Sequence, residues 1–311
     1  MNRKKIILFN ITSRCNESCS FCLKSSFLKK GLSDLDLQEI KGNYFFLKKS
    51  NHISHVVLTG GEPTLHSNFL KILDFFESQN VDISLVTNLL RISQSNYFFS
   101  KIKPYFSKDK NNRIIASVNH LPSFSQKEKQ RALGFIKILQ NQLNFGLTIL
   151  IYKENIDTLG ELSLWLRDNI ERYYRGIFEI ELRFLYFSET PKDILIDSLP
   201  KEKQVAPTVS DFLAPWSNTD LPVNIMPSRF PLCYINNFNK IDLGVIKLRG
   251  NRCYLLVDKE FQREKAQLID VRGQGVDQCN NCLLRNICMA GDYLKYQGKG
   301  WQPSIKPFKK L

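Results

Sequence analysis

Three cysteines lie close together near the start of the chain, at Cys15, Cys19 and Cys22 in the stretch TSRCNESCSFC. Thiolates so spaced can form disulfides, bind zinc or hold an iron–sulfur cluster. Disulfides would leave one thiol over, and the apolar stretch 6–9 is too short for a signal peptide. Zinc would need a fourth ligand nearby, whereas the next cysteine is Cys233. The run therefore favours a cluster held by three thiolates, with one iron open to a non-protein ligand.

This stretch, with the aromatic Phe21 just before its last cysteine, resembles the cluster loop of the radical S-adenosylmethionine (radical SAM) superfamily. The resemblance implies that Cys15, Cys19 and Cys22 bind a 4Fe-4S cluster and that SAM binds the open iron. It also implies reductive cleavage of SAM to a 5'-deoxyadenosyl radical, which abstracts hydrogen from a substrate. An electron donor such as flavodoxin or ferredoxin is implied as a partner.

Short β-branched runs alternate with amphipathic runs over the first part of the chain, which is typical of a parallel α/β sheet or barrel. We expect a partial (β/α)6 TIM-like barrel over residues 1–190 and a smaller C-terminal cysteine-rich metal-binding domain over 191–311. The predicted strands begin at Lys5, His55, Asp82, Arg113, Leu147 and Ile177, and the predicted helices span 35–49, 68–78, 92–102, 126–142 and 159–173.

The segment GGEP follows the second predicted strand, and loops after strands carry the chemistry of parallel barrels. A sharp turn is one interpretation of its glycines. In radical SAM enzymes, however, the matching segment approaches the methionine part of SAM. The resemblance therefore implies that Gly60 and Gly61 admit the ligand and that Glu62 accepts hydrogen bonds from its ammonium group.

Further SAM contacts are implied at other strand ends. Ser117 and Asn119 resemble polar residues that meet the ribose or carboxylate of SAM, and Asn88 takes the place of the Asn in a Thr-Asn-Gly ending, where Leu89 replaces the glycine. Arg183 either pairs with the SAM carboxylate or is a structural arginine.

Two polar residues near strand ends have less specific interpretations. His120 is a candidate for contact with the substrate, with a structural histidine as the alternative. Asn155 is a candidate cap of the helix that follows it.

A second group of cysteines follows polar, proline-bearing segments beyond residue 190, where we expect the barrel-like alternation to end. The run C-x2-C-x5-C, formed by Cys279, Cys282 and Cys288, predicts a second metal site with Cys233 as the fourth ligand. It resembles the auxiliary-cluster regions called SPASM and Twitch, although no cysteine follows Cys288. Auxiliary 4Fe-4S and structural zinc are both compatible with these thiolates. Cys253, in a predicted hairpin strand, is the alternative ligand, a core residue or a hydrogen-atom donor near the substrate.

The composition limits the class of protein. The chain has 311 residues, 43% of them hydrophobic, and no apolar stretch long enough to span a membrane. Its eight cysteines without secretory features predict a cytoplasmic protein. A net charge of +14 favours acidic partners such as RNA, nucleotides or an acidic peptide, with a solvated basic surface as the alternative.

Three hypotheses of function follow. The first is radical chemistry on a small molecule such as a modified nucleobase or nucleoside, by a lyase or rearrangement reaction, with epimerase and oxidoreductase chemistry also open. The second is a maturase that modifies a ribosomally made peptide. Because only residues 1–14 precede Cys15, we expect no leader-binding module, which favours the first hypothesis. The third is a non-catalytic iron–sulfur or zinc scaffold.

Overall fold

The computed structural model describes residues 5–22, 34–185, 198–217, 219–228, 232, 253–257, 268–269 and 288. These residues belong to two compact units. Unit 1 takes its described residues from 1–117, 130–146 and 251–270, and unit 2 takes them from 118–129, 147–250 and 271–311. We describe each unit by itself.

Unit 1 is built on a sheet whose strands run in the order β4-β3-β2-β1-β8-β9. All neighbours are parallel except β9, which is antiparallel to β8. The apolar side chains of β1 other than Leu8 are buried, as expected for a central parallel strand. The strands are β1 (Lys5–Thr12), β2 (Ile53–Gly60), β3 (Asp82–Thr87), β4 (Arg113–Ser117), β8 (Cys253–Val257) and β9 (Leu268–Ile269).

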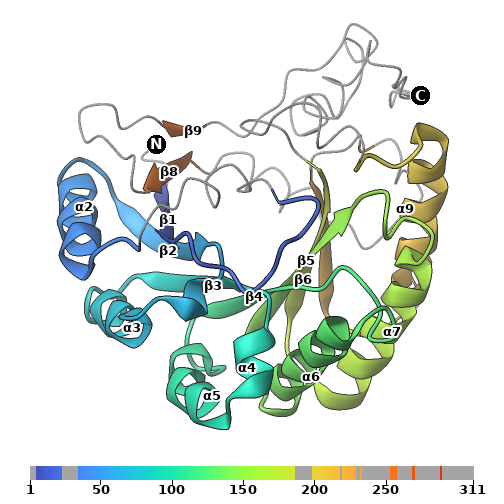
Figure 1. Ribbon diagram of the computed structural model, residues 1–311, viewed down its shortest axis with the longest axis horizontal. Coiled ribbons are helices and arrows are strands. Elements are labelled where there is room, and N and C mark those ends of the chain that lie inside the picture. The colour runs from blue at the N-terminus through green and yellow to red at the C-terminus, as the bar shows by residue number, and fades with distance from the viewer. Residues whose placement is uncertain are drawn as a thin grey trace, which may run out of the picture. The chain divides into compact units, whose positions relative to one another are not determined.

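The helices that connect β1 to β4 lie on one side of these strands (Figure 1). They pack through aromatic residues: the Tyr44 and Phe76 rings meet edge to face at 5.5 Å, and Phe76 also contacts Phe9 of β1. The helices are α2 (Leu37–Ser50), α3 (Phe69–Ser78), α4 (Leu90–Gln94) and α5 (Asn96–Ile102), with short 3₁₀ turns at Pro63–Leu65 and Lys103–Phe106.

The helix predicted at 92–102 is two helices instead of one. Ser95 has extended backbone dihedrals, and its hydroxyl accepts a hydrogen bond from the Phe98 amide at 3.1 Å. Ser95 therefore ends α4 and caps α5, because a serine side chain at this position satisfies a free amide of the new helix.

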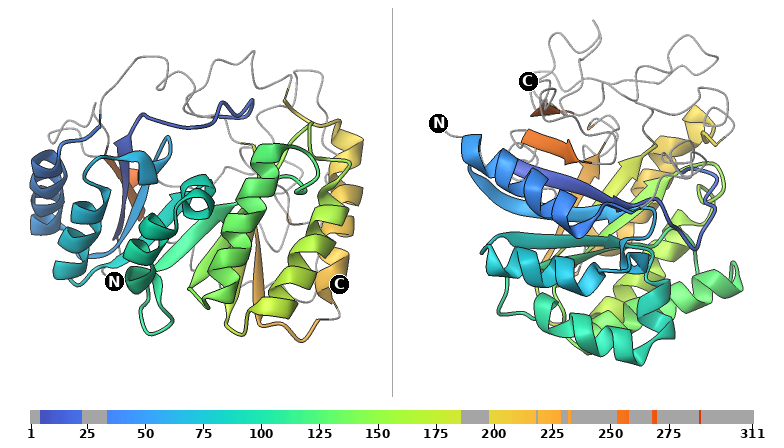
Figure 2. Two further views of the ribbon diagram at one scale, coloured as in Figure 1. Left: turned by 60° about the horizontal axis from the view of Figure 1, so that its bottom comes forward. Right: turned by 60° about the vertical axis from the view of Figure 1, so that its left-hand side comes forward.

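Unit 2 contains β6 (Phe178–Phe184) and β7 (Val223–Ser228), which are parallel, and most of β5 (Phe145–Ile151) beside β6. Its helices α7 (Leu159–Tyr173) and α9 (Glu202–Ser217) lie side by side (Figure 2). The Ser163 hydroxyl joins them by donating to the Phe212 carbonyl and accepting from the Trp216 indole. The remaining helix, α6 (Gln126–Gln140), contributes residues to both units.

The strand–helix alternation does not end near residue 190, and that expectation is wrong. After β6 the chain forms α9 and then β7, which extends the parallel pairing of β6. The segment that includes β8, far along the sequence, pairs in parallel with β1. The partition into domains at 1–190 and 191–311 stays a prediction.

None of the helices described is long and apolar enough to cross a membrane.

Candidate functional site

The three N-terminal cysteines lie in the loop that follows β1. Their thiols are free and half-buried, and the Cys22 amide donates to the Cys19 carbonyl at 3.1 Å. The loop begins at the carboxyl end of a buried strand, which is the edge of a parallel sheet where catalytic groups collect.

The glycine pair at the end of β2 packs directly against the start of this loop. The Gly61 amide donates to the Thr12 carbonyl at 2.8 Å, and the Glu62 amide donates to the Arg14 carbonyl at 2.7 Å. A Cβ atom at Gly61 would lie 2.3 Å from the Arg14 carbonyl oxygen, and one at Gly60, whose φ is +145°, would lie 2.4 Å from that of Thr12. Both positions therefore need glycine to admit the chain's own backbone, and their contact with SAM stays a prediction.

Glu62 is buried, with 1% of its surface exposed, and four groups of the chain donate to its carboxylate. Oε1 accepts from the Thr64 amide and hydroxyl and from the Thr87 hydroxyl, while Oε2 accepts from the Asn88 amide at 2.8 Å. Burial raises the pKa of Glu62, and these hydrogen bonds oppose the rise. Glu62 thus ties the end of β2 to the end of β3, and among the described residues Oε2 accepts from one donor whereas Oε1 accepts from three.

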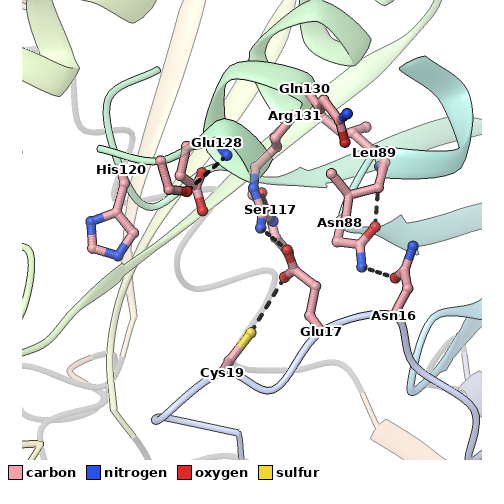
Figure 3. A network of polar contacts seen from close by, with 12 residues as sticks. Asn16, Glu17, Cys19, Asn88, Leu89, Ser117, His120, Glu128, Gln130 and Arg131 are labelled. Atoms are coloured by element: carbon pink, nitrogen blue, oxygen red, sulfur yellow. Dashed lines mark hydrogen bonds and ion pairs between the residues drawn. The ribbon is translucent and has the colours of Figure 1, made fainter. Parts of the chain in front are cut away.

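Asn88 connects the end of β3 to the cysteine loop. Its Nδ2 donates to Asn16 Oδ1 at 2.7 Å, and its Oδ1 accepts from the Leu90 amide at the start of α4 (Figure 3). Leu89, which stands where the resemblance to radical SAM enzymes implies a glycine, adopts the left-handed backbone with φ 67° while its side chain is fully buried. The turn therefore keeps a conformation that suits glycine and costs a leucine of order 1 kcal/mol.

Glu17 attaches the same loop to α6. One carboxylate oxygen accepts from Arg131 Nη2 at 2.6 Å, and the other accepts from the Cys19 thiol at 3.4 Å (Figure 3). Arg131 Nη1 donates to the Ser117 carbonyl at 3.1 Å, while the Ser117 hydroxyl makes no hydrogen bond within the described residues. The sequence analysis missed Asn16, Glu17 and Arg131, because the only local signal was a carboxylate between two cysteines, which is equally typical of a solvated loop.

Asp34 supports the loop at its base. Its carboxylate accepts from the Thr12 hydroxyl and from both Nε and Nη2 of Arg14. Burial opposes ionisation, but these hydrogen bonds outweigh it and hold the pKa of Asp34 below its ordinary value of 3.8.

The donor set fits a cubane cluster better than a single metal ion. Within the part of the chain that the structure describes, no three Cys, His, Asp or Glu side chains converge on one point, as the ligands of a zinc ion must. A 4Fe-4S cluster takes each thiolate on a different iron, so its three ligands stay apart. Burial raises the pKa of Cys15, and burial together with Glu17 raises the pKa of Cys19 to about 12. Binding of the iron must therefore displace protons from these thiols.

The predicted site residues of unit 2 make contacts within that unit. Asn119 Oδ1 accepts from the Leu150 amide at 2.8 Å, and its carbonyl accepts from Asn155 Nδ2. Asn119 is buried, and its contact with SAM stays a prediction. Asn155 is fully buried and accepts from the Tyr152 amide, whereas the residue that precedes α7 as its cap is Thr158. The suggestion that Asn155 caps this helix is wrong.

His120 and Arg183 complete the predicted set in unit 2. His120 is buried, stacks on the Phe124 ring at 4.0 Å and hydrogen-bonds to the Tyr152 hydroxyl. Arg183, on β6, is paired with Glu181 at 2.8 Å. Phe178, on the buried face of the strand, contacts Trp216 of α9, so strand alternation places Glu181 and Arg183 on the face away from that helix.

Most of the predicted C-terminal metal site lies outside the described residues, namely Cys233, Cys279 and Cys282. Cys288 is half-buried and belongs to no disulfide among the described residues. Cys253 is the first residue of β8, where its backbone pairs with Lys5 of β1. It lies in a strand as predicted, and that strand pairs with β1 and β9.

Comparison with known proteins finds curated relatives that match part of this chain. Mycofactocin maturase MftC of Mycolicibacterium smegmatis is 25% identical over 170 residues, which cover 50% of this chain and 40% of the relative. An S-adenosylmethionine-dependent nucleotide dehydratase of Selenomonas ruminantium is 32% identical over 79 residues, 25% of this chain and 28% of the relative. The chain thus spans less than half the length of either curated relative.

Solved structures with the same fold are found as well. Streptococcus suis SuiB bound to S-adenosylmethionine matches with a TM-score of 0.59 at 14% identity, covering 99% of this chain and 77% of SuiB. SuiB bound to its precursor peptide SuiA matches with a TM-score of 0.57 at 14% identity, covering 97% of this chain and 74% of SuiB. The likeness confirms the expected parallel α/β fold of the partial-barrel type.

The family model that matches is that of the radical SAM superfamily, over residues 9–166. This range contains the cysteine loop, GGEP and Arg131, the groups that the structure connects by hydrogen bonds in unit 1. With half of its length matched, the chain belongs to the radical SAM superfamily of enzymes.

Proposed function

We propose that the protein cleaves SAM reductively at a 4Fe-4S cluster held by Cys15, Cys19 and Cys22. The observation that carries the proposal is the loop itself: three free, half-buried thiols on a segment fixed by β2, β3 and α6. When bound there, the cluster and SAM supply a 5'-deoxyadenosyl radical that abstracts hydrogen from a substrate.

The chain's own residues would hold and orient SAM. In unit 1, Glu62 Oε2 offers an acceptor for the ammonium group, and the Ser117 hydroxyl offers a donor. Gly60 and Gly61 bring their backbone close to the end of β1 and the start of the same loop, and Asn88 reaches the loop through its side chain. In unit 2, Asn119 offers Nδ2 to an oxygen of SAM, and Arg183 offers a guanidinium for a carboxylate.

The substrate that we propose is a small molecule of the nucleotide or nucleoside class. The net charge of +14 suits an acidic substrate, and a relative that acts on nucleotides is 32% identical over the region it shares. Peptide maturation is the second candidate, favoured by the likeness to the maturase MftC and to SuiB, which was solved with its precursor peptide.

For the C-terminal cysteines we propose one auxiliary site, with Cys233, Cys279, Cys282 and Cys288 as ligands of a second 4Fe-4S cluster or of zinc. Four thiolates serve either metal. Iron, sulfide and zinc remaining in a variant without the N-terminal cluster would identify the metal.

The function is tested by anaerobic reconstitution of wild type and a Cys15→Ala/Cys19→Ala/Cys22→Ala variant, followed by reduction and assay of 5'-deoxyadenosine. We expect wild type to form it and the variant to form none. Absence from wild type, or formation by the variant, would refute the proposal.

The substrate class is tested with the same readout, because substrate commonly accelerates SAM cleavage that is otherwise abortive. Nucleosides, nucleoside triphosphates and cysteine-containing peptides are added separately to the reduced enzyme. Acceleration by nucleosides or nucleotides supports the first class, and acceleration by peptides alone supports maturation.

A further inference from the structure

A buried ion pair lies between the cysteine loop and α6. Glu17, between Cys15 and Cys19 in sequence, is paired with Arg131 at 2.6 Å, and the two side chains are only 7% and 6% exposed. Breaking such a pair at one partner leaves an uncompensated buried charge, which is strongly destabilising. The pair therefore constrains where the loop sits relative to α6.

The second oxygen of Glu17 faces Cys19, which places the carboxylate between a guanidinium and a proposed cluster ligand. A thiol can donate to this oxygen, but a cluster-bound thiolate carries no proton and cannot. The carboxylate and the thiolate are then two negative groups in a partly dehydrated site. The positive charge of Arg131 attracts the carboxylate and offsets its repulsion by the thiolate.

A charge this close to the cluster also affects how readily the cluster accepts an electron. Reduction adds one negative charge, so an unbalanced carboxylate makes it harder and an unbalanced guanidinium makes it easier. Glu17 and Arg131 carry opposite charges, so their effects on the cluster oppose each other.

We propose that Glu17 and Arg131 are positioning residues for Cys19 and that their charge balance sets the reduction potential of the cluster. The inference rests on the proposed function, since it assumes that the cysteine loop holds a cluster. Glu17 and Arg131 would thus orient one ligand and tune the potential, which the three cysteines alone do not do.

The test compares Glu17→Gln, Arg131→Gln and the double variant with wild type by redox titration of the cluster, followed by electron paramagnetic resonance. Only the signal lost in the triple cysteine variant is followed. Lys137→Gln is the matched control, because Lys137 is a positive residue of α6 that donates to Ile92, Ser93 and Asn96 instead of the loop.

We expect opposite shifts. The reduction potential of the cluster falls in Arg131→Gln and rises in Glu17→Gln. In the double variant it lies close to the wild-type value, and in the control Lys137→Gln it does not change. Each single variant loses iron to a chelator about tenfold faster than wild type, as is usual when a partner of a metal ligand is removed. Shifts of the potential in the same direction, or no shifts, would overturn the proposal. A purely structural role would not make the direction of the shift depend on which charge is removed.

Loss of the cluster in a variant is informative as well. If both single variants fail to load iron while the folded double variant loads it, the loop rejects unbalanced charge, as proposed. If the double variant is folded by circular dichroism yet stays empty, the proposal is wrong. If the double variant does not fold, Arg131→Lys is the deciding variant. It keeps the positive charge and should therefore keep the reduction potential of wild type. A fall of the potential like that in Arg131→Gln would overturn the proposal.

The two proposals fail differently. If wild type shows no signal that depends on the three cysteines, the proposed function fails. If wild type shows that signal and the variants do not shift it in opposite directions, only the role of the ion pair fails.

Discussion

Unit 1 and unit 2 both place buried or half-buried polar side chains at or just after strand ends, but these side chains have different roles in the two units. In unit 1, Glu62 and Asn88 hold strand ends to one another and to the cysteine loop. In unit 2, Asn119 hydrogen-bonds to a backbone amide within β5, and Asn155 to backbone groups of Tyr152 and Asn119. A buried polar residue at a strand end is thus either an anchor for a functional loop or a support for the sheet, and only its partners distinguish the two.

The largest expected effect that sharpens this comparison is that of Gly61→Ala. Its methyl group would meet backbone atoms of Arg14, so the loop must move, and we expect loss of the N-terminal cluster and about 3 kcal/mol of unfolding free energy. Iron content and denaturant unfolding measure both. The matched control is Gly160→Ala in α7, where the new atom lies 3.5 Å from Asp211 and should stabilise the helix by about 1 kcal/mol. Full iron content in Gly61→Ala would show that the glycine pair does not position the loop.

A second pair of variants separates anchoring from support. Glu62→Ala and Asn155→Ala each leave several buried partners unsatisfied, so each should lower the unfolding free energy by about 3 kcal/mol. Only Glu62→Ala should also release iron from the N-terminal cluster, because only Glu62 lies beside the loop. Equal iron content in both variants after reconstitution would show that Glu62 does not anchor the cysteine loop any more than Asn155 does.

Asn119 tests whether unit 2 also contributes to SAM binding. Asn119→Ala removes the donor Nδ2 and should weaken SAM affinity about fivefold, the equivalent of one hydrogen bond of about 1 kcal/mol. Titration calorimetry on the reconstituted protein measures the change. Asn169→Ala in α7, whose amide donates to the Trp165 carbonyl, is the control. Unchanged affinity in Asn119→Ala would make Asn119 a support for the sheet alone.

The smallest effect concerns Asp34 at the base of the loop. Because the pKa of Asp34 is lower in the folded chain than its ordinary 3.8, its ionised form stabilises the fold above that pH. Asp34→Asn should therefore cost about 0.5 to 1 kcal/mol at pH 7, as expected for a partly exposed pair. The difference should shrink as pH falls below about 4 and vanish once the folded carboxyl is protonated. Urea unfolding at pH 7 and pH 3 measures it, and a difference that grows on acidification would contradict this sign.

The sequence predicted the local features well because each has a local cause. The strand at Lys5–Thr12 and the helix at Leu159–Tyr173 have the expected bounds, since apolar periodicity and β-branched content determine them. The break at Ser95 was missed because the apolar pattern runs through it, although a serine that can cap a helix was a usable signal.

Long-range contacts were not predictable from one sequence. The pairing of β8 with β1 joins residues far apart in the chain, and no local pattern encodes which strand lies beside β1. The Glu17–Arg131 pair has the same origin, since opposite charges occur at many positions and only the fold selects one partner. Leu89 shows the reverse case: the turn persists although its glycine is replaced, because the surrounding contacts hold the left-handed conformation.

The most direct test of the central claim is the electron paramagnetic resonance spectrum of the reduced, reconstituted protein with and without SAM. We predict a signal of a reduced 4Fe-4S cluster that changes when SAM is added and that is absent from the Cys15→Ala/Cys19→Ala/Cys22→Ala variant. A spectrum that ignores SAM, or that survives removal of the three cysteines, would contradict the assignment of this loop as the site of SAM cleavage.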